Sequence, residues 1–217
     1  SNPAVAALLD LLRLRLPLSA EEGEPSFPRR QVVEAWRSPY LDWGPANPEA
    51  GNVRTECTGG VADGGPLEGK GYAALADSLD SLARWGQVVR GLAQWREAFT
   101  RRLQLAADEH SDEDPEWAGM LPDAEGVRAL QEPFERFVKR LEPPPAEGVD
   151  GYVAWLEALI GPEETEDQAD QDSLRIFLRA RQGGGITAER DVAALRALKD
   201  VLRGMVWTEQ VLGTAAP

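Results

Sequence analysis

The chain has 217 residues, of which 42% are hydrophobic, and its formal net charge is −14. This length and apolar content allow a substantial buried core, whereas the acidic excess opposes non-specific attraction to nucleic-acid phosphates, so any nucleic-acid contact must be a local basic patch. The single cysteine, Cys57, excludes an internal disulfide, a cysteine-based zinc site and a four-cysteine iron–sulfur cluster within these residues. No run of about eighteen uncharged apolar residues occurs, so we expect a soluble, cytoplasmic protein with no membrane contact.

Apolar residues recur at helical spacing along almost the whole chain, while runs of alternating β-branched residues are absent. The sequence therefore predicts an all-α protein. We expect one irregular multi-helix domain over residues 1–217, with an N-terminal half at 3–107 and C-terminal helices at 123–213. Because the chain opens inside a helix pattern, we also expect it to be a segment of a longer protein.

The first predicted helix covers residues 3–16, with Pro3 suited to its first turn. Its apolar stripe is expected at Val5, Leu8, Leu9, Leu12 and Leu16. A short helix is predicted at 28–37. Residues 43–71 are rich in Gly, Pro, Asn and Asp without an apolar period, which predicts a long loop.

Near the end of this loop, the stretch DGGPLEGKGY resembles a phosphate-binding loop. Gly64 precedes the Gly69–Lys70 pair at nearly the required spacing, but Gly71 stands where a hydroxyl should hold Mg²⁺. The residues before Gly64 are polar and glycine-rich, so no buried strand leads into the stretch. We interpret the match as chance and expect no cofactor in this segment.

The strongest helical pattern spans residues 75–103 and predicts one or two long helices. Its apolar positions are Leu75, Leu79, Leu82, Trp85, Val88, Val89, Leu92, Trp95, Phe99 and Leu103. Gly86 and Gly91 allow a break or a close helix crossing. Trp85, Trp95 and Phe99 have the chemistry to stack on single-stranded bases, but their helical spacing among leucines favours core positions.

The C-terminal part of the chain predicts further helices separated by acidic connectors. The run at 108–117 contains the only histidine, His110, and is interpreted as a solvated acidic turn rather than a metal loop. An apolar stripe at 127–141 predicts a helix that Pro133 should kink or divide. Three more helices are expected, at 150–160 with Asp150 as cap, at 173–181, and from Thr187 as N-cap to about Leu212.

Four stretches carry a family resemblance. NPAVAALLDLLRLRL and FPRRQVVEAWRSPYLDW, followed later by SLARWGQVVRGLAQWREAF and DGYVAWLEALI, resemble a region of the AddB-like family of bacterial ATP-dependent nuclease subunits. That family joins helicase-derived modules to a nuclease. The resemblance implies that this chain is the mostly helical subdomain inserted in the second motor domain of a superfamily 1 helicase-like protein, and that the parent protein has the ATP-dependent helicase and nuclease activity.

The preferred functional hypothesis is a non-catalytic helical domain that shapes the DNA path in double-strand-break repair and recombination. Its partners would be DNA, contacted through the parent protein, and a helicase/nuclease partner subunit. The densest basic pairs, Arg29–Arg30 and Arg101–Arg102, are the candidate phosphate contacts, although such pairs are more often solvated or salt-bridged. No catalytic or metal-binding constellation is legible, so enzymatic activity of this segment stays open. The alternative is a helical protein–protein interaction module that docks a partner subunit, and a stand-alone helical enzyme is the weakest hypothesis.

Overall fold

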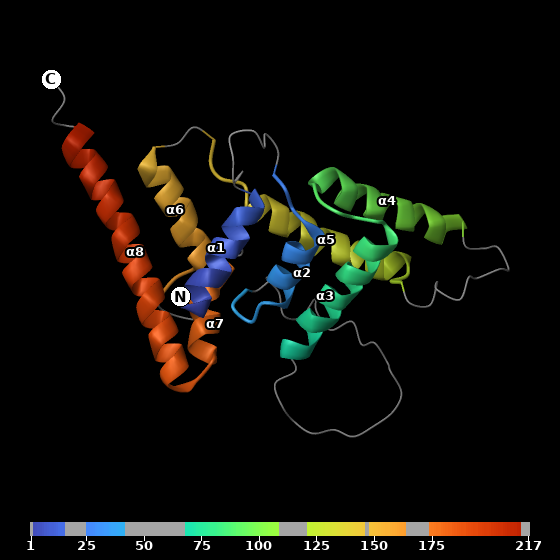
Figure 1. Cartoon of the computed structure of the whole chain (residues 1–217), viewed down its shortest axis with the longest axis horizontal. Coiled ribbons are helices and arrows are strands. Elements are labelled where there is room, and N and C mark those ends of the chain that lie inside the picture. Colours follow the sequence, from blue (N-terminus) through green and yellow to red (C-terminus); the bar gives the residue numbers. More distant parts are fainter. Residues whose placement is uncertain are drawn as a thin grey trace. The chain divides into compact units, whose positions relative to one another are not determined.

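The computed structural model describes residues 2–15, 25–41, 68–108, 121–145, 148–163 and 174–213, and these residues form eight α-helices without a strand (Figure 1). The predicted all-α class is confirmed. The helices are α1 (Pro3–Arg15), α2 (Arg29–Arg37), α3 (Glu68–Trp85), α4 (Leu92–Asp108), α5 (Ala124–Arg140), α6 (Val149–Ile160), α7 (Ile176–Gln182) and α8 (Gly185–Gly213). None of the helices in the described part of the chain is long and apolar enough to cross a membrane.

The chain forms two compact units that interleave along the sequence. The first unit combines residues 1–16, 38–42 and 138–217, and the second combines residues 17–37 and 43–137. The predicted organisation, a single domain with two sequential halves, stays a prediction.

An aromatic cluster forms the core of the second unit. The ring of Phe134 lies 5.2 Å from that of Trp95 and 5.3 Å from that of Phe99, measured between ring centroids. Trp36 and Phe137 complete the cluster in a T-shaped contact at 6.1 Å. All five side chains are almost completely buried, so each contributes about 2–3 kcal/mol or more of hydrophobic stabilisation. The interpretation of Trp95 and Phe99 as core residues is confirmed.

Proline does not divide α5. The helix continues from Ala124 to Arg140 with Pro133 inside it, at a position that is buried. A proline in a helix interior costs about 3 kcal/mol. The neighbouring Leu130, Phe134 and Phe137 are no more than 1% exposed, and their burial offsets that cost.

In the first unit, α8 packs against α1, α6 and α7 (Figure 1). One buried carboxylate, Asp191 on α8, joins two distant segments: it accepts a hydrogen bond from Asn2 Nδ2 at 2.7 Å and another from the Tyr40 hydroxyl at 2.8 Å. The Asn2 side chain also caps α1, because its Oδ1 accepts from the backbone N–H groups of Ala4 and Val5.

A second buried charge, Lys199, also holds α8 to its neighbours. Its Nζ donates to the carbonyl oxygen of Gly161, at the end of α6, over 2.6 Å. It also lies 5.5 Å from the centre of the Phe177 ring on α7. Both buried charges of α8 are therefore satisfied inside the unit.

Several predicted details of the helices are wrong. The buried row of α1 is Ala4, Leu8, Leu11 and Leu14, rotated from the predicted stripe, of which Leu9 is exposed. Because α1 is apolar on most sides, its leucines alone do not identify the inward face, whereas the exposed pair Asp10–Arg13 marks the outward one.

The predicted helix starts also differ from the observed ones. Gly148, not Asp150, occupies the cap position of α6, and no side chain in the described ranges caps that helix. Thr187 lies inside α8, which begins at Gly185. The helix α3 begins at Glu68, so the last residues of the predicted loop are helical, while the rest of that loop lies outside the described residues.

Candidate nucleic-acid interface

The connector between α3 and α4, residues 86–91, reverses the chain sharply. A Cβ on Gly86 would lie 2.5 Å from the Cβ of Ala98, so only glycine permits the two helices to approach this closely. Gly91 has a φ of 88°, a left-handed conformation that favours glycine and breaks the helical run before α4. Both glycines thus have the roles that the sequence suggested.

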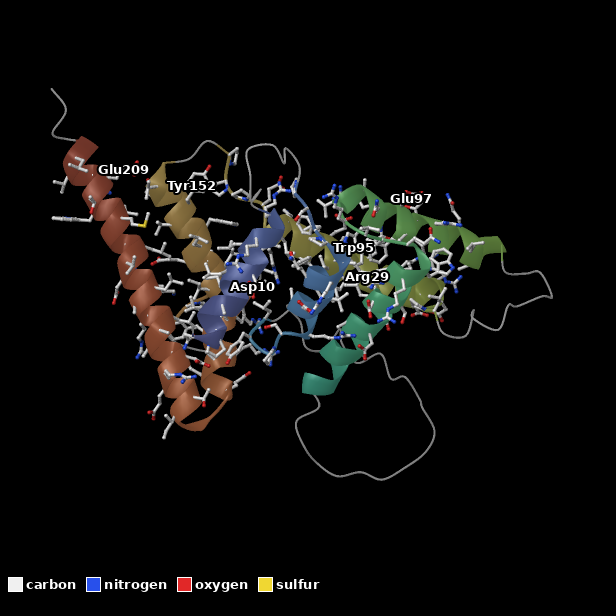
Figure 2. All side chains as sticks on the ribbon, in the orientation of Figure 1. Asp10, Arg29, Trp95, Glu97, Tyr152 and Glu209 are labelled. Carbon is white, nitrogen blue, oxygen red and sulfur yellow. The ribbon has the colours of Figure 1, made fainter. Side chains whose placement is uncertain are left out.

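The connector is fastened to the segment that precedes α2. The backbone N–H of Gly91 donates to Ser26 O at 2.7 Å, and that of Arg29 donates to Val89 O at 3.1 Å. Trp95 on α4 donates its indole N–H to Phe27 O at 3.0 Å, which places Trp95 and Arg29 in the same part of the unit (Figure 2). These bonds hold the start of α2 beside the connector.

The side chain of Gln94, on α4, also stabilises the connector. Its Oε1 accepts from the backbone N–H groups of Val89 and Arg90, at 2.8 and 3.1 Å. Gln94 is the third residue of α4, so a side chain in the first turn of the helix satisfies two backbone donors that precede it. Phe27 and Gln87 adopt positive φ values of 31° and 54°, a strained backbone that the surrounding bonds maintain.

Three arginines from α2 and α3 surround one nearly buried carboxylate, Asp80. Arg84 lies 2.8 Å from it, Arg37 3.8 Å and Arg29 4.0 Å, measured between nitrogen and carboxylate oxygen. Arg37 also pairs with Asp77 at 2.7 Å. The carboxylates therefore position the guanidinium groups without neutralising all of them.

Further arginines extend the basic area. Arg30 is 86% exposed, and among the described residues it pairs with Glu34 on its own helix, whose hydrogen bond and charge raise the pKa of the guanidinium. Arg90 is exposed at the end of the connector. Arg101 on α4 is exposed as well, and its guanidinium lies 5.4 Å from the centre of the Trp85 ring. Trp85 itself is only half-buried, contrary to the predicted core position.

We call this area the arginine surface. It comprises Arg29, Arg30, Arg37, Arg84, Arg90 and Arg101.

The charge of these segments is opposite to that of the whole protein. Residues 25–41 and 74–106 contain eight arginines and four acidic residues, a net charge of +4 in a chain whose total is −14. One acid, Glu97, lies on the exposed outer side of α4 (Figure 2). Arg96 pairs with Glu135 and Arg102 is buried, so the six arginines of the arginine surface exceed the four acids of these segments by two. The arginine surface is therefore a modest local basic patch, which is the kind of feature that an acidic nucleic-acid-binding protein requires.

Three of the four predicted phosphate contacts belong to the arginine surface: Arg29, Arg30 and Arg101. The fourth, Arg102, is only 2% exposed, and its Nε donates to the carbonyl oxygen of Pro122 at 3.0 Å. In this position Arg102 supports the start of the 121–145 segment.

Sequence reasoning missed three members of the surface: Arg37, Arg84 and Arg90. A signal for the first two was present, because Arg37 follows Arg30 by seven residues and Arg84 follows Asp77 by seven, spacings that place side chains on one helical face.

Guanidinium groups recognise phosphate through paired N–H donors, and an exposed aromatic ring offers a stacking face for a base. The arginine surface supplies the guanidinium groups, whereas the neighbouring Trp85 ring is half-buried and has the Arg101 guanidinium over it. Among the described residues, no group of three or more His, Cys, Asp or Glu side chains could hold a metal ion. Cys57, His110 and the side chain of Lys70 lie outside the described residues.

Comparisons of the chain with protein-family models, with curated proteins and with solved structures find no match.

Proposed function

We propose that this chain is a non-catalytic, DNA-facing helical domain of an AddB-like protein, an ATP-dependent helicase/nuclease. In double-strand-break repair and recombination it would guide a DNA strand along the arginine surface and support the neighbouring modules. The chemistry belongs to the parent protein, and a second helicase/nuclease chain is the expected partner.

One observation carries this proposal. Two of the stretches that resemble the AddB-like family, residues 27–43 and 81–99, are distant in the sequence but meet in the second unit, where Arg29 N–H bonds to Val89 O and Trp95 bonds to Phe27 O. The same two stretches supply five of the six arginines of the surface. The stretches that carry the family resemblance are therefore largely the same stretches that form the arginine surface.

The strength of binding follows from the charges. Each phosphate contact releases counterions, so the affinity should fall steeply with salt. With a net charge of −14 on the whole chain, we expect a dissociation constant of roughly 10⁻⁵ M for a single-stranded oligonucleotide at about 20 mM salt, and weaker binding at physiological salt.

Fluorescence anisotropy of a labelled oligonucleotide tests the surface. Replacing Arg30 and Arg90 together by alanine should weaken binding about tenfold and reduce the slope of log K against log salt by about 1.4, because two phosphate contacts are lost. Arg13→Ala is the matched control: Arg13 is exposed and pairs with Asp10 in the first unit, so its loss should change affinity only slightly. Equal losses in both variants, or no binding at about 100 μM protein, would contradict the proposal.

The identity of the parent protein has a separate test. The gene should extend beyond these residues and encode motor and nuclease motifs. A gene that encodes a complete protein of this size alone would contradict a helicase/nuclease parent, while leaving the binding experiment meaningful.

A further inference from the structure

Val89, in the connector between α3 and α4, is an apolar residue whose side chain projects into solvent. It is 70% exposed, more than any other large apolar side chain in the described part of the second unit, where the next is Leu105 at 37%. A single exposed valine on a protein surface needs no explanation by itself. The backbone bonds and the neighbours of Val89 distinguish it from such a residue.

The backbone of Val89 is fixed on both sides. Its N–H donates to Gln94 Oε1 at 2.8 Å, and its carbonyl oxygen accepts from the N–H of Arg29 at 3.1 Å. The preceding Val88 is buried, and its N–H donates to Ala83 O at 2.9 Å. Because Val88 is anchored inside the unit and both polar groups of Val89 are bonded, the side chain of Val89 points outward from a fixed backbone.

Backbone strain is concentrated in the same place. Among the described residues, three non-glycine residues have a positive φ, and two of them are Gln87 in the connector and Phe27 in the segment bonded to it. Such conformations are unfavourable, persist only where the surrounding structure maintains them, and cluster at functional sites. The outward turn at Val89 is therefore maintained at a cost in stability.

Cationic residues are the neighbours of this apolar side chain. Arg90 is the next residue along the chain and is exposed. The hydrogen bond from Arg29 brings the start of α2 to Val89, and the exposed Arg30 follows Arg29 there. Val89 is therefore an apolar side chain next to residues of the arginine surface.

These two kinds of side chain match the two chemical parts of a nucleic-acid strand. Guanidinium groups bind the phosphates, whereas an apolar side chain gains nothing from a phosphate and contacts bases instead. In a duplex the faces of the bases are stacked on one another, while in a single strand they are free to contact a protein side chain. An apolar contact beside phosphate-binding arginines therefore favours a single strand.

We propose that Val89 is a base-contacting residue of the arginine surface, and that its contact makes the surface prefer single-stranded to duplex DNA. This inference rests on the proposed function, because the arginines must first hold the strand by its phosphates. The contact buries the exposed valine against a base, so it adds affinity without releasing a counterion. The salt dependence of binding therefore separates the effect of Val89 from that of the arginines.

Fluorescence anisotropy with three DNA probes of equal length tests the contact. The probes are a single-stranded oligonucleotide, the same strand made with abasic sites throughout, and a duplex. Val89→Ala should bind the single strand about fivefold more weakly than the wild-type chain, with an unchanged slope of log K against log salt. It should bind the abasic strand and the duplex as tightly as the wild-type chain does. Val89→Phe, which enlarges the apolar face, should match or exceed the wild-type affinity for the single strand.

Leu9→Ala is the matched control, since Leu9 is a 48% exposed apolar residue of the first unit, and it should leave all three affinities unchanged. Thermal unfolding checks that the variants are folded, as expected for an exposed side chain whose backbone bonds remain.

The outcomes separate this inference from the proposed function. Equal weakening of all three probes by Val89→Ala would overturn the inference, because the contact would not involve bases. Unchanged affinities in Val89→Ala, while the variant that lacks Arg30 and Arg90 loses binding as expected, would overturn the inference and leave the proposed function intact. No binding of the single strand by the wild-type chain would contradict both.

Discussion

Charged side chains have different roles in the two units of this protein. In the first unit, Asp191 and Lys199 are buried, and each is satisfied by hydrogen bonds inside the unit. In the second unit, Asp80 shares its charge among three arginines that remain partly exposed. The same types of residue therefore hold helices together in one unit and leave positive charge available to a ligand in the other.

The largest effect is expected from the core beneath the arginine surface. Trp95→Ala should lower the free energy of unfolding by about 3–5 kcal/mol, since it leaves a cavity beside Phe134 and removes the bond to Phe27 O. Leu92→Ala, at a half-buried position in the first turn of α4, should cost only about 1 kcal/mol. Chemical denaturation of both variants checks this ranking, and equal losses would show that Leu92 is also a core residue.

A smaller loss is expected in the first unit. Asp191→Ala leaves the Tyr40 hydroxyl and the Asn2 amide without their acceptor, which should cost about 1–3 kcal/mol. Asp191→Asn keeps the shape and one acceptor, so it should lose less. Thermal unfolding compares the two, and neither should alter binding to DNA if the two units have separate roles.

Replacing Asp80, the acid that three arginines share, should lower stability slightly but strengthen binding to an oligonucleotide. Asp80→Asn should cost no more than about 1 kcal/mol, because its arginine partners are partly exposed. The same change raises the positive charge of the arginine surface, so affinity for an oligonucleotide should increase severalfold at low salt. Weaker binding by this variant would mean that Asp80 positions the arginines in a way that the charge gain cannot replace.

The smallest effect concerns pH. Burial lowers the pKa of Lys199 below its usual range, so between this lowered value and about 10.5 the unfolded chain binds more protons than the folded one. Stability should therefore rise with pH over that window, and Lys199→Met should lose the rise. Melting temperatures of both proteins at pH 7.5 and 9.5 check this. The upper limit avoids Tyr40, whose burial and bond to Asp191 raise its pKa above 10.

The helices of this protein could be predicted from the sequence more easily than the faces they bury. Helical periodicity located the helices, and Gly86 and Gly91 marked the break between α3 and α4. The prediction of the buried face was wrong where the pattern was ambiguous. The helix α1 is apolar on most sides, and Val89, which was predicted in a helix, lies in the connector and is exposed. Tertiary contacts decide such positions.

The candidate site could be predicted only in part for a related reason. Arg29 and Arg30 are adjacent in the sequence and were found, whereas Arg84 and Arg90 join them only after the connector folds back on the start of α2. Arg101 and Arg102 look alike in the sequence, but adjacent residues point about 100° apart around a helix, so α4 exposes the first and buries the second. A pair of adjacent basic residues on a helix therefore does not by itself show that both side chains reach the surface.

Mapping the DNA contact by amide NMR tests the central claim most directly. A short single-stranded oligonucleotide is titrated into the isotope-labelled chain at about 20 mM salt, and chemical-shift changes are recorded along the sequence. We predict that the changes cluster at residues 29–37 and 84–91 and at the Trp85 indole. Changes confined to α1, α6 or α8, or spread evenly over both units, would contradict a DNA-facing role for the arginine surface.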